Sequence, residues 1–258
     1  MNYAVLQKTL EAPAIDKLRR AFRNVPGLTP ADAHILGNDA FGILVKGFTL
    51  ERASAMQRAL AAEGVESEVV PEPQLPKLPE VRFVNRVDCT SHALMVFDPL
   101  GRSFPVEWKH IALIAAGRVC MTEFNRMRVV REVVRYSQDG SPYRDSEVNY
   151  DTREERNDRL LLELVLSRGV LRYSVTADKA AARLFQYLGA RGTGDLLKDF
   201  TLLVQDVAKF APHAVINRGA YYFRKGAAEP FRYPTKNAFY EEIVWLRWKL
   251  ANAQEAVA

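Results

Sequence analysis

The sequence predicts an α+β protein with two domains. Three observations lead to this fold class: a β-α-β-β-α-β order near the N-terminus, a run of short strands followed by helices in the remainder, and a proline-rich stretch between them. Each proline removes an amide donor and favours extended backbone in the residue before it. We therefore expect a first domain over 1–70, a semi-rigid linker over 71–80 and a second domain over 81–258.

The first 70 residues alternate between strand and helix patterns. They predict strands at 3–8, 33–36, 41–46 and 66–70, and helices at 14–24 and 50–63. Thr49 can cap the first amides of the second helix, and Gly64 can adopt the left-handed conformation that ends it. The order β-α-β-β-α-β predicts a ferredoxin-like domain, in which two helices cover one face of a four-stranded antiparallel sheet.

The second half of this domain, GILVKGFTLERASAMQRALAAEGVESEVV, resembles the C-terminal domain of the bacterial ribosomal stalk protein. The resemblance covers about thirty residues: an apolar-Lys-Gly opening, a helix and an EGVESEVV exit. It implies a small docking module and carries over no catalytic residue.

The second domain begins with short strand patterns and ends with helices. Strands are predicted in VRFVNRVDC, HALMVFD, RSFPVEW, HIALIAAGRVCM, RLLLELVLS and GVLRYSVT, and helices near 178–187, 196–210 and 237–252. This spacing favours an antiparallel, strongly curved sheet. The helix over 196–210 has one apolar side, formed by Leu196, Phe200, Leu203, Val204, Val207 and Phe210, which can cover a sheet or the end of a barrel.

The stretch DPLGRSFPVEWKHIALI within this region resembles the early strands of bacterial pleckstrin-homology-like (PH-like) domains. That resemblance implies a barrel over about 81–210 that ends in an amphipathic helix, and it leaves the last forty or so residues without a counterpart. Many such barrels bind only proteins, and others bind anionic surfaces.

Residues 126–159 are dominated by charged and polar side chains around Asp139-Gly140. An Asp-Gly pair flanked by valine, tyrosine and arginine is typical of a hairpin turn. A long hairpin is therefore favoured over a mobile excursion, since several valines would be costly in a solvated loop.

The composition indicates what kind of protein this is and where it is expected to reside. The chain has 258 residues, 48% of them hydrophobic, and a formal net charge of +5. It contains two cysteines, Cys89 and Cys120, at no metal-ligand spacing, so we expect no disulfide and a reduced, cytoplasmic setting. No secretory leader and no transmembrane segment are expected.

Two stretches are candidate anion-binding sites. The first is a basic run whose alternative interpretation is a solvated strand face balanced by nearby acids, and it contains Arg118, Arg126, Arg128, Arg131 and Arg135. The second is the glycine-rich LGARGTGDLL ahead of a helix, where amides could hold a phosphate or could form an ordinary capped loop; its candidate residues are Arg191, Gly192 and Gly194.

No catalytic or metal-ligand constellation is present in the sequence. The four histidines are scattered, no nucleophile signature occurs, and no dinucleotide or P-loop fingerprint is found. We therefore expect a protein that is not an enzyme and has no cofactor and no metal. Nucleic-acid binding is disfavoured, because Tyr3 and Phe41 are the only aromatics where stacking strands would present them.

The C-terminal helix, NAFYEEIVWLRWKLANA, has an apolar stripe too wide for a surface helix. Such a stripe either packs deeply in its own domain or meets another chain, and its candidate interface residues are Phe239, Tyr240, Trp245 and Trp248. The function that these patterns favour is a protein-interaction or scaffold module, through a partner chain or self-association. The alternative is binding of an anionic ligand, a peripheral membrane surface or a nucleic-acid backbone through 118–135.

Overall fold

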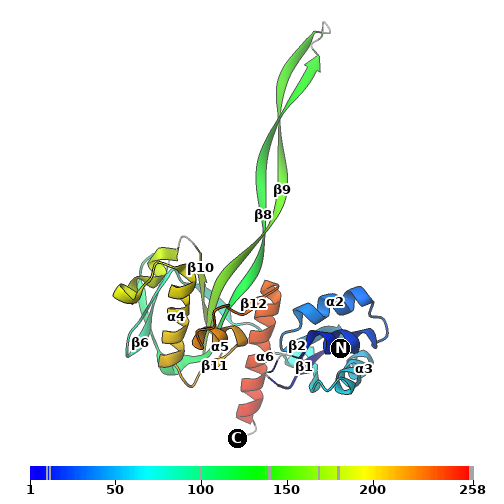
Figure 1. Ribbon diagram of the computed structural model, residues 1–258, viewed down its shortest axis with the longest axis vertical. Coiled ribbons are helices and arrows are strands. Elements are labelled where there is room, and N and C mark those ends of the chain that lie inside the picture. Colours follow the sequence, from blue (N-terminus) through cyan, green and yellow to red (C-terminus); the bar gives the residue numbers. More distant parts are fainter. Residues whose placement is uncertain are drawn as a thin grey trace. The chain divides into compact units, whose positions relative to one another are not determined.

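The computed structural model describes residues 1–258 except Leu10, Ala12, Pro99, Ser137, Asp139, Gly140, Arg168, Lys179, Ala180 and 256–258. It is a mixed α+β structure with several sheets, as expected (Figure 1). The chain forms two compact units, one made of 1–119 with 159–258 and the other of 120–158. Among the described helices, none is both long and apolar enough to cross a membrane.

The N-terminal region contains a three-stranded antiparallel sheet in the order β2-β1-β3. Its strands are β1 (Tyr3–Gln7), β2 (Ile43–Phe48) and β3 (Ser67–Pro71), and its helices are α1 (Ile15–Arg23), α2 (Pro30–Asp39) and α3 (Leu50–Ala62). The expected helices at 14–24 and 50–63 and the strands at 3–8, 41–46 and 66–70 are confirmed. The Thr49 side chain accepts from the Arg52 amide, and Gly64 has a φ of 71°.

The strand expected at 33–36 is wrong, because these residues lie in α2. Thr29 and Asp32 form a reciprocal capping box there, in which the Thr29 hydroxyl accepts from the Asp32 amide and the Asp32 carboxylate accepts from the Thr29 amide. Pro30 occupies the first turn, where its missing N–H is not needed. The sheet therefore has three strands among the described residues, and the order is β-α-α-β-α-β.

The rest of the chain builds two sheets. One has six strands, β11-β8-β9-β10-β4 with β12 also on β8, and the other has the order β5-β6-β7. The strands are β4 (Glu80–Phe83), β5 (Arg86–Cys89), β6 (Ala93–Phe97), β7 (Ser103–Glu107), β8 (Ile111–Tyr136), β9 (Pro142–Leu166), β10 (Leu171–Ala177), β11 (Val215–Ile216) and β12 (Arg232–Tyr233).

These sheets differ from the expected antiparallel barrel in two ways. No barrel is closed among the described strands, because VRFVNRVDC divides into β4 and β5, which belong to different sheets. The larger sheet is also mixed, since β4 runs parallel to β10, and β11 and β12 run parallel to β8. A strand that follows a helix can pair in parallel with an earlier strand. The prediction considered only strands joined by hairpins, which are antiparallel.

The helical elements after β10 are η3 (Ala181–Arg191), α4 (Leu196–Phe210), α5 (Arg218–Arg224) and α6 (Lys236–Glu255), and short 3-10 turns also occur at Glu72–Gln74 and Trp108–His110. The segment expected as a helix at 178–187 is the 3-10 element η3, with a break at Gly189. The other two expected helices are confirmed as α4 and α6, whereas α5 was not foreseen. The apolar side expected for α4 is confirmed, because Phe200, Leu203, Val204 and Val207 are buried.

Two separate hydrophobic cores lie on either side of the proline-rich stretch. One gathers buried residues from 5–65, and the other gathers buried residues from 84–223. Residues on both sides of 71–80 nevertheless belong to the same compact unit, so the domain boundary expected there stays a prediction.

Candidate functional site

The expected long hairpin is confirmed as the outer parts of β8 and β9, and its Asp139-Gly140 turn lies outside the described residues. In 111–119 and 160–165 both faces of these strands are largely buried, whereas in 120–158 nearly every described side chain is exposed or half-buried. In Figure 1 the two strands wind around one another. Both strands change from buried to exposed near residues 119 and 159, and this change coincides with the boundary of the 120–158 unit.

The basic run predicted as an anion site lies along β8. Arg118 belongs to the larger unit, whereas Arg126, Arg128, Arg131 and Arg135 lie in the hairpin. Between 120 and 136 there are four arginines against two acids, but between 142 and 158 there are three arginines against six acids. Because β8 and β9 are neighbours, the positive strand lies beside a negative one. The alternative of a balanced strand face is thus favoured.

Contacts across the hairpin show which side chains share a face. Arg126 lies over the Tyr150 ring, Arg144 is 3.7 Å from Glu132, Arg135 is 3.1 Å from Asp145, and Asn125 donates to Glu155 at 3.0 Å. Each of these contacts joins two even or two odd residue numbers. Since side chains alternate between the two faces of a strand, even-numbered residues of both strands lie on one face and odd-numbered residues on the other.

The even-numbered face carries most of the exposed apolar surface of the hairpin. Among the described side chains of 120–158, six large apolar ones are exposed, and five of these have even numbers: Phe124, Val130, Val134, Val148 and Tyr150, with exposed fractions between 39% and 68%. The sixth is Met127. We call the residues with even numbers in 124–134 and 144–156 the even-numbered face. Sequence reasoning identified the hairpin and its arginines but not this alignment of apolar side chains.

The glycine-rich loop ahead of α4 is occupied by carboxylates of the chain itself. Buried Asp199 accepts from the amides of Thr193 at 2.7 Å and Gly194 at 3.1 Å. The Gly192 amide donates to the Gly189 carbonyl. The loop amides are therefore bound by a carboxylate of the chain itself, which favours the alternative of an ordinary capped loop over a phosphate site.

The third member of that predicted anion site, Arg191, is held by another acid. Its guanidinium contacts Asp206 through Nη1 at 3.0 Å and Nη2 at 2.9 Å, and the Tyr187 hydroxyl donates to the same carboxylate at 2.9 Å. This bidentate contact uses the two guanidinium N–H groups of Arg191 that a phosphate would otherwise bind.

The aromatic side chains of α6 lie inside the chain and do not form a free interface. The Trp245 indole donates to the Gln7 carbonyl at 2.8 Å, the Trp248 indole to Glu68 at 3.3 Å and the Tyr240 hydroxyl to Glu163 at 3.0 Å. The wide stripe is therefore used to pack α6 against the first domain and the larger sheet. Of the four candidate interface residues, Phe239 and Trp245 are fully buried, and Tyr240 and Trp248 are half-buried. This favours the alternative in which the stripe packs within its own chain.

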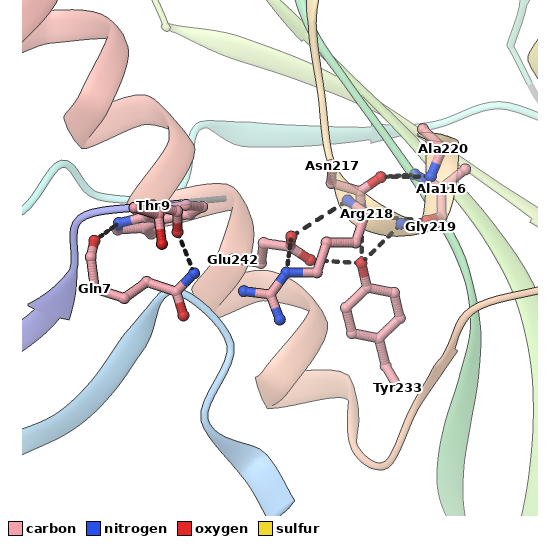
Figure 2. A network of polar contacts seen from close by, with 10 residues as sticks. Gln7, Thr9, Ala116, Asn217, Arg218, Gly219, Ala220, Tyr233 and Glu242 are labelled. Atoms are coloured by element: carbon pink, nitrogen blue, oxygen red, sulfur yellow. Dashed lines mark hydrogen bonds and ion pairs between the residues drawn. The ribbon is translucent and has the colours of Figure 1, made fainter. Parts of the chain in front are cut away.

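A buried polar centre joins α5, β12 and α6 (Figure 2). The Glu242 carboxylate lies 3.3 Å from the Arg218 guanidinium and accepts from the Tyr233 hydroxyl at 2.5 Å. Asn217 bridges this centre to β8: it donates to Tyr233 and to the Ala116 carbonyl, and it accepts from the Ala116 amide at 2.9 Å. These contacts join α5, β12 and α6 to β8, so the centre fixes three elements against the sheet, while Nε and Nη2 of Arg218 are buried without a hydrogen-bond partner among the described residues.

The pKa values in this centre follow from burial. Loss of solvent raises the pKa of Glu242, and the nearby Arg218 charge opposes that rise. Burial, followed by the Glu242 charge, raises the pKa of Tyr233 well above its ordinary value. The rise in the pKa of Tyr233 keeps its hydroxyl protonated, so that it donates to the Glu242 carboxylate.

A second buried carboxylate, Glu163 of β9, is bound from three directions. It accepts from Arg172 at 2.5 Å, from the Ser174 hydroxyl at 2.8 Å and from the Tyr240 hydroxyl. Burial raises the pKa of Glu163, and the Arg172 charge opposes that rise. Both buried acids thus serve as anchors for α6. Their long-range partners give no signal in a single sequence.

Both cysteines are free thiols, and burial raises the pKa of Cys89 to about 12. In the part of the chain that the structure describes, no three His, Cys, Asp or Glu side chains gather as metal ligands would.

Comparison with family models, curated proteins and solved structures finds no match for this chain.

Proposed function

We propose that this chain is a protein-interaction module that binds a partner on the even-numbered face of the hairpin. The observation that carries the proposal is the alignment of five exposed large apolar side chains on one face of a two-stranded ribbon. Several exposed apolar side chains on one face are typical of interaction surfaces, whereas single exposed apolar residues are not. Isolated two-stranded hairpins also gain little stability by themselves, so a partner would add the missing packing layer.

The charges of this face define the chemistry of the partner. Glu132 is paired with Arg144, and Glu154 with Arg156 at 3.0 Å. Arg128 has no ion-pair partner among the described residues, and neighbouring Arg126 lies over Tyr150. A complementary protein segment therefore presents apolar side chains together with aspartate or glutamate.

The resemblances to the ribosomal stalk domain and to PH-like domains stay predictions, and both are compatible with a module that acts by docking rather than by catalysis. The alternative function, binding of an anionic ligand or surface through 118–135, has less support. The acids of β9 lie beside those arginines, and Arg135 is already paired with Asp145. A nucleic-acid backbone or an anionic membrane would meet those carboxylates as well.

A random peptide library displayed on phage and selected against the immobilised full chain tests the proposal. We expect the selected peptides to combine aliphatic or aromatic residues with Asp or Glu. Binding should be lost when Phe124, Val130 and Tyr150 are replaced together by serine, because all three are exposed and the apolar contact disappears. The matched control replaces Met127 and Val133 of the opposite face by serine and should retain binding.

Two single arginine variants test whether peptide binding needs a charge on the even-numbered face or only the positive charge of the hairpin. Arg128→Ala on the even-numbered face should weaken peptide binding, whereas Arg131→Ala on the opposite face should not. Vesicles of phosphatidylserine and a DNA duplex serve as the competing probes. The proposal fails if peptides bind the triple serine variant as well as the unchanged chain. It also fails if the vesicles or DNA bind through both arginines while the selected peptides carry no acids.

A further inference from the structure

Three adjoining hollows surround the segment that connects β4 with β5. The first has a volume of about 540 Å³ and includes Phe83, Asn85 and Arg183 in its lining. The second, of about 340 Å³, also contains Phe83, together with Phe104. The third, of about 470 Å³, shares Asn85 and Arg183 with the first. Because they share lining residues, the three hollows are neighbours, and each volume lies within the range of small-molecule sites, about 300–1,000 Å³.

The region is basic. Its lining residues include two acids, Asp98 and Asp178, against five arginines, Arg82, Arg86, Arg102, Arg159 and Arg183. Asp88, which pairs with Arg86 at 2.6 Å, adds a third acid, so the region has a formal charge of +2. Charge concentrated in a concave region attracts anions more strongly than the same charge spread over a surface.

Two of these arginines are available for a ligand. The other three are paired with acids: Arg102 with Asp98 at 2.7 Å, Arg86 with Asp88 at 2.6 Å and Arg159 with Asp178 at 3.3 Å. Arg82 and Arg183 are exposed, and neither has an acidic or hydrogen-bonding partner among the residues that the structure describes. Guanidinium groups with free donor edges match the oxygens of a phosphate in bidentate geometry.

Two phenylalanines present their rings beside these charges. Phe83 is 63% exposed and Phe104 is 45% exposed, and both line the second hollow. Backbone pairing fixes their positions, because Phe83 is opposite Ser174 on β10 and Phe104 is opposite Val96 on β6. Exposed aromatic rings on strands are stacking surfaces for flat ring systems.

We propose that this region binds a nucleotide, with Arg82 and Arg183 on the phosphate and the rings of Phe83 and Phe104 on the base. A phosphate alone would not use the rings, and an uncharged aromatic molecule would not use the free guanidinium groups. None of these residues belongs to the hairpin, so the inference goes beyond the proposed protein-docking function. It also places anion recognition at the β4–β5 connection, away from the arginines of 118–135.

Isothermal titration calorimetry of the full chain with AMP, ATP and GTP tests the proposal, with inorganic phosphate and adenosine as separate probes. We expect saturable one-to-one binding of at least one nucleotide, and weaker binding of phosphate and of adenosine, because each uses half of the contacts. Affinity for the nucleotide should fall as salt rises, since exposed charge pairs are screened.

Single variants test which residues bind the phosphate and which bind the base. Arg82→Ala and Arg183→Ala should each weaken nucleotide binding by about tenfold, the loss expected for a hydrogen bond to a charged group. Phe83→Ala should weaken nucleotide and adenosine binding but leave phosphate binding unchanged. Arg23→Ala and Ile35→Ala are the controls, because both side chains are exposed and belong to neither proposed binding surface.

Three outcomes would overturn the nucleotide assignment. They are no saturable binding of AMP, ATP or GTP up to millimolar concentration, binding that none of the three site variants weakens, and binding of a single-stranded oligonucleotide without binding of any mononucleotide.

Discussion

The Tyr233 hydroxyl donates to the Glu242 carboxylate at 2.5 Å in the fully buried contact between β12 and α6. The same hydroxyl accepts from Asn217 at 2.8 Å and from the Gly219 amide at 3.2 Å. One phenol oxygen thus connects a two-residue strand, the start of α5 and the C-terminal helix. A group with three buried partners is expensive to remove, because each partner loses its hydrogen bond.

Tyr233→Phe removes this oxygen while keeping the ring. We expect the free energy of unfolding to fall by about 1–3 kcal/mol, the cost of leaving buried polar groups unpaired. Urea unfolding followed by circular dichroism measures the change. Tyr222→Phe is the matched control, since Tyr222 is exposed and its hydroxyl makes no hydrogen bond with the described residues. Equal stability of the two variants would contradict the role of the Tyr233 hydroxyl.

Gly219→Ala tests how closely α5 approaches the large sheet. A Cβ built at this position would lie 1.9 Å from the Ala116 carbonyl oxygen, which belongs to backbone and cannot rotate away. We expect a loss of about 1–3 kcal/mol or more in unfolding free energy, the usual cost of overpacking. Gly37→Ala in α2 is the control, because its nearest neighbour is a flexible Arg19 side chain at 3.3 Å. A thermal melt in which Gly219→Ala matches the unchanged protein would disprove the close approach.

Cys89 should react slowly with alkylating reagents. Burial raises the pKa of its thiol to about 12, so at pH 8 only about one thiol in ten thousand is ionised. A more basic thiolate is a stronger nucleophile, which recovers part of this loss, and we expect at least about tenfold slower alkylation than in the unfolded chain. The rate should rise with pH towards 12.

The labelling measurement uses the Cys120→Ser variant, which leaves a single thiol, with iodoacetamide and timed mass spectrometry. The same variant in guanidinium chloride gives the reference rate. Equal rates in the folded and unfolded protein would contradict the raised pKa.

Limited proteolysis tests the domain boundary at 71–80. The protease Lys-C cleaves after lysine, residues 120–158 contain none, and Lys77 lies in the linker with its side chain exposed. We expect an early cut after Lys77 that yields fragments of about 77 and 181 residues. Lys77→Ala should abolish that cut. A single protected fragment that spans the linker in the unchanged chain would contradict the boundary.

The sequence by itself determined most local elements of this protein. Helical spacing and a threonine cap specified α3, short apolar runs specified β1 and β3, and an apolar side specified α4. The helix α2 was also encoded locally, because Thr29, Pro30 and Asp32 form a capping signature that outweighs the strand predicted at 33–36. The hairpin could be predicted as well, since valines and an Asp-Gly pair favour extended strands around a turn.

Only the tertiary structure decided which of these elements meet and which side chains remain exposed. The buried anchors Glu163 and Glu242 find partners from other elements, and the amides expected to bind a phosphate are taken by Asp199. The α6 tryptophans became internal because β1 and β3 supplied acceptors, whereas the even-numbered face stayed open because no other element covers it among the described residues. Local propensity depends on neighbours a few residues apart. Burial and charge pairing depend on contacts between residues far apart in the chain, and a single sequence does not record those contacts.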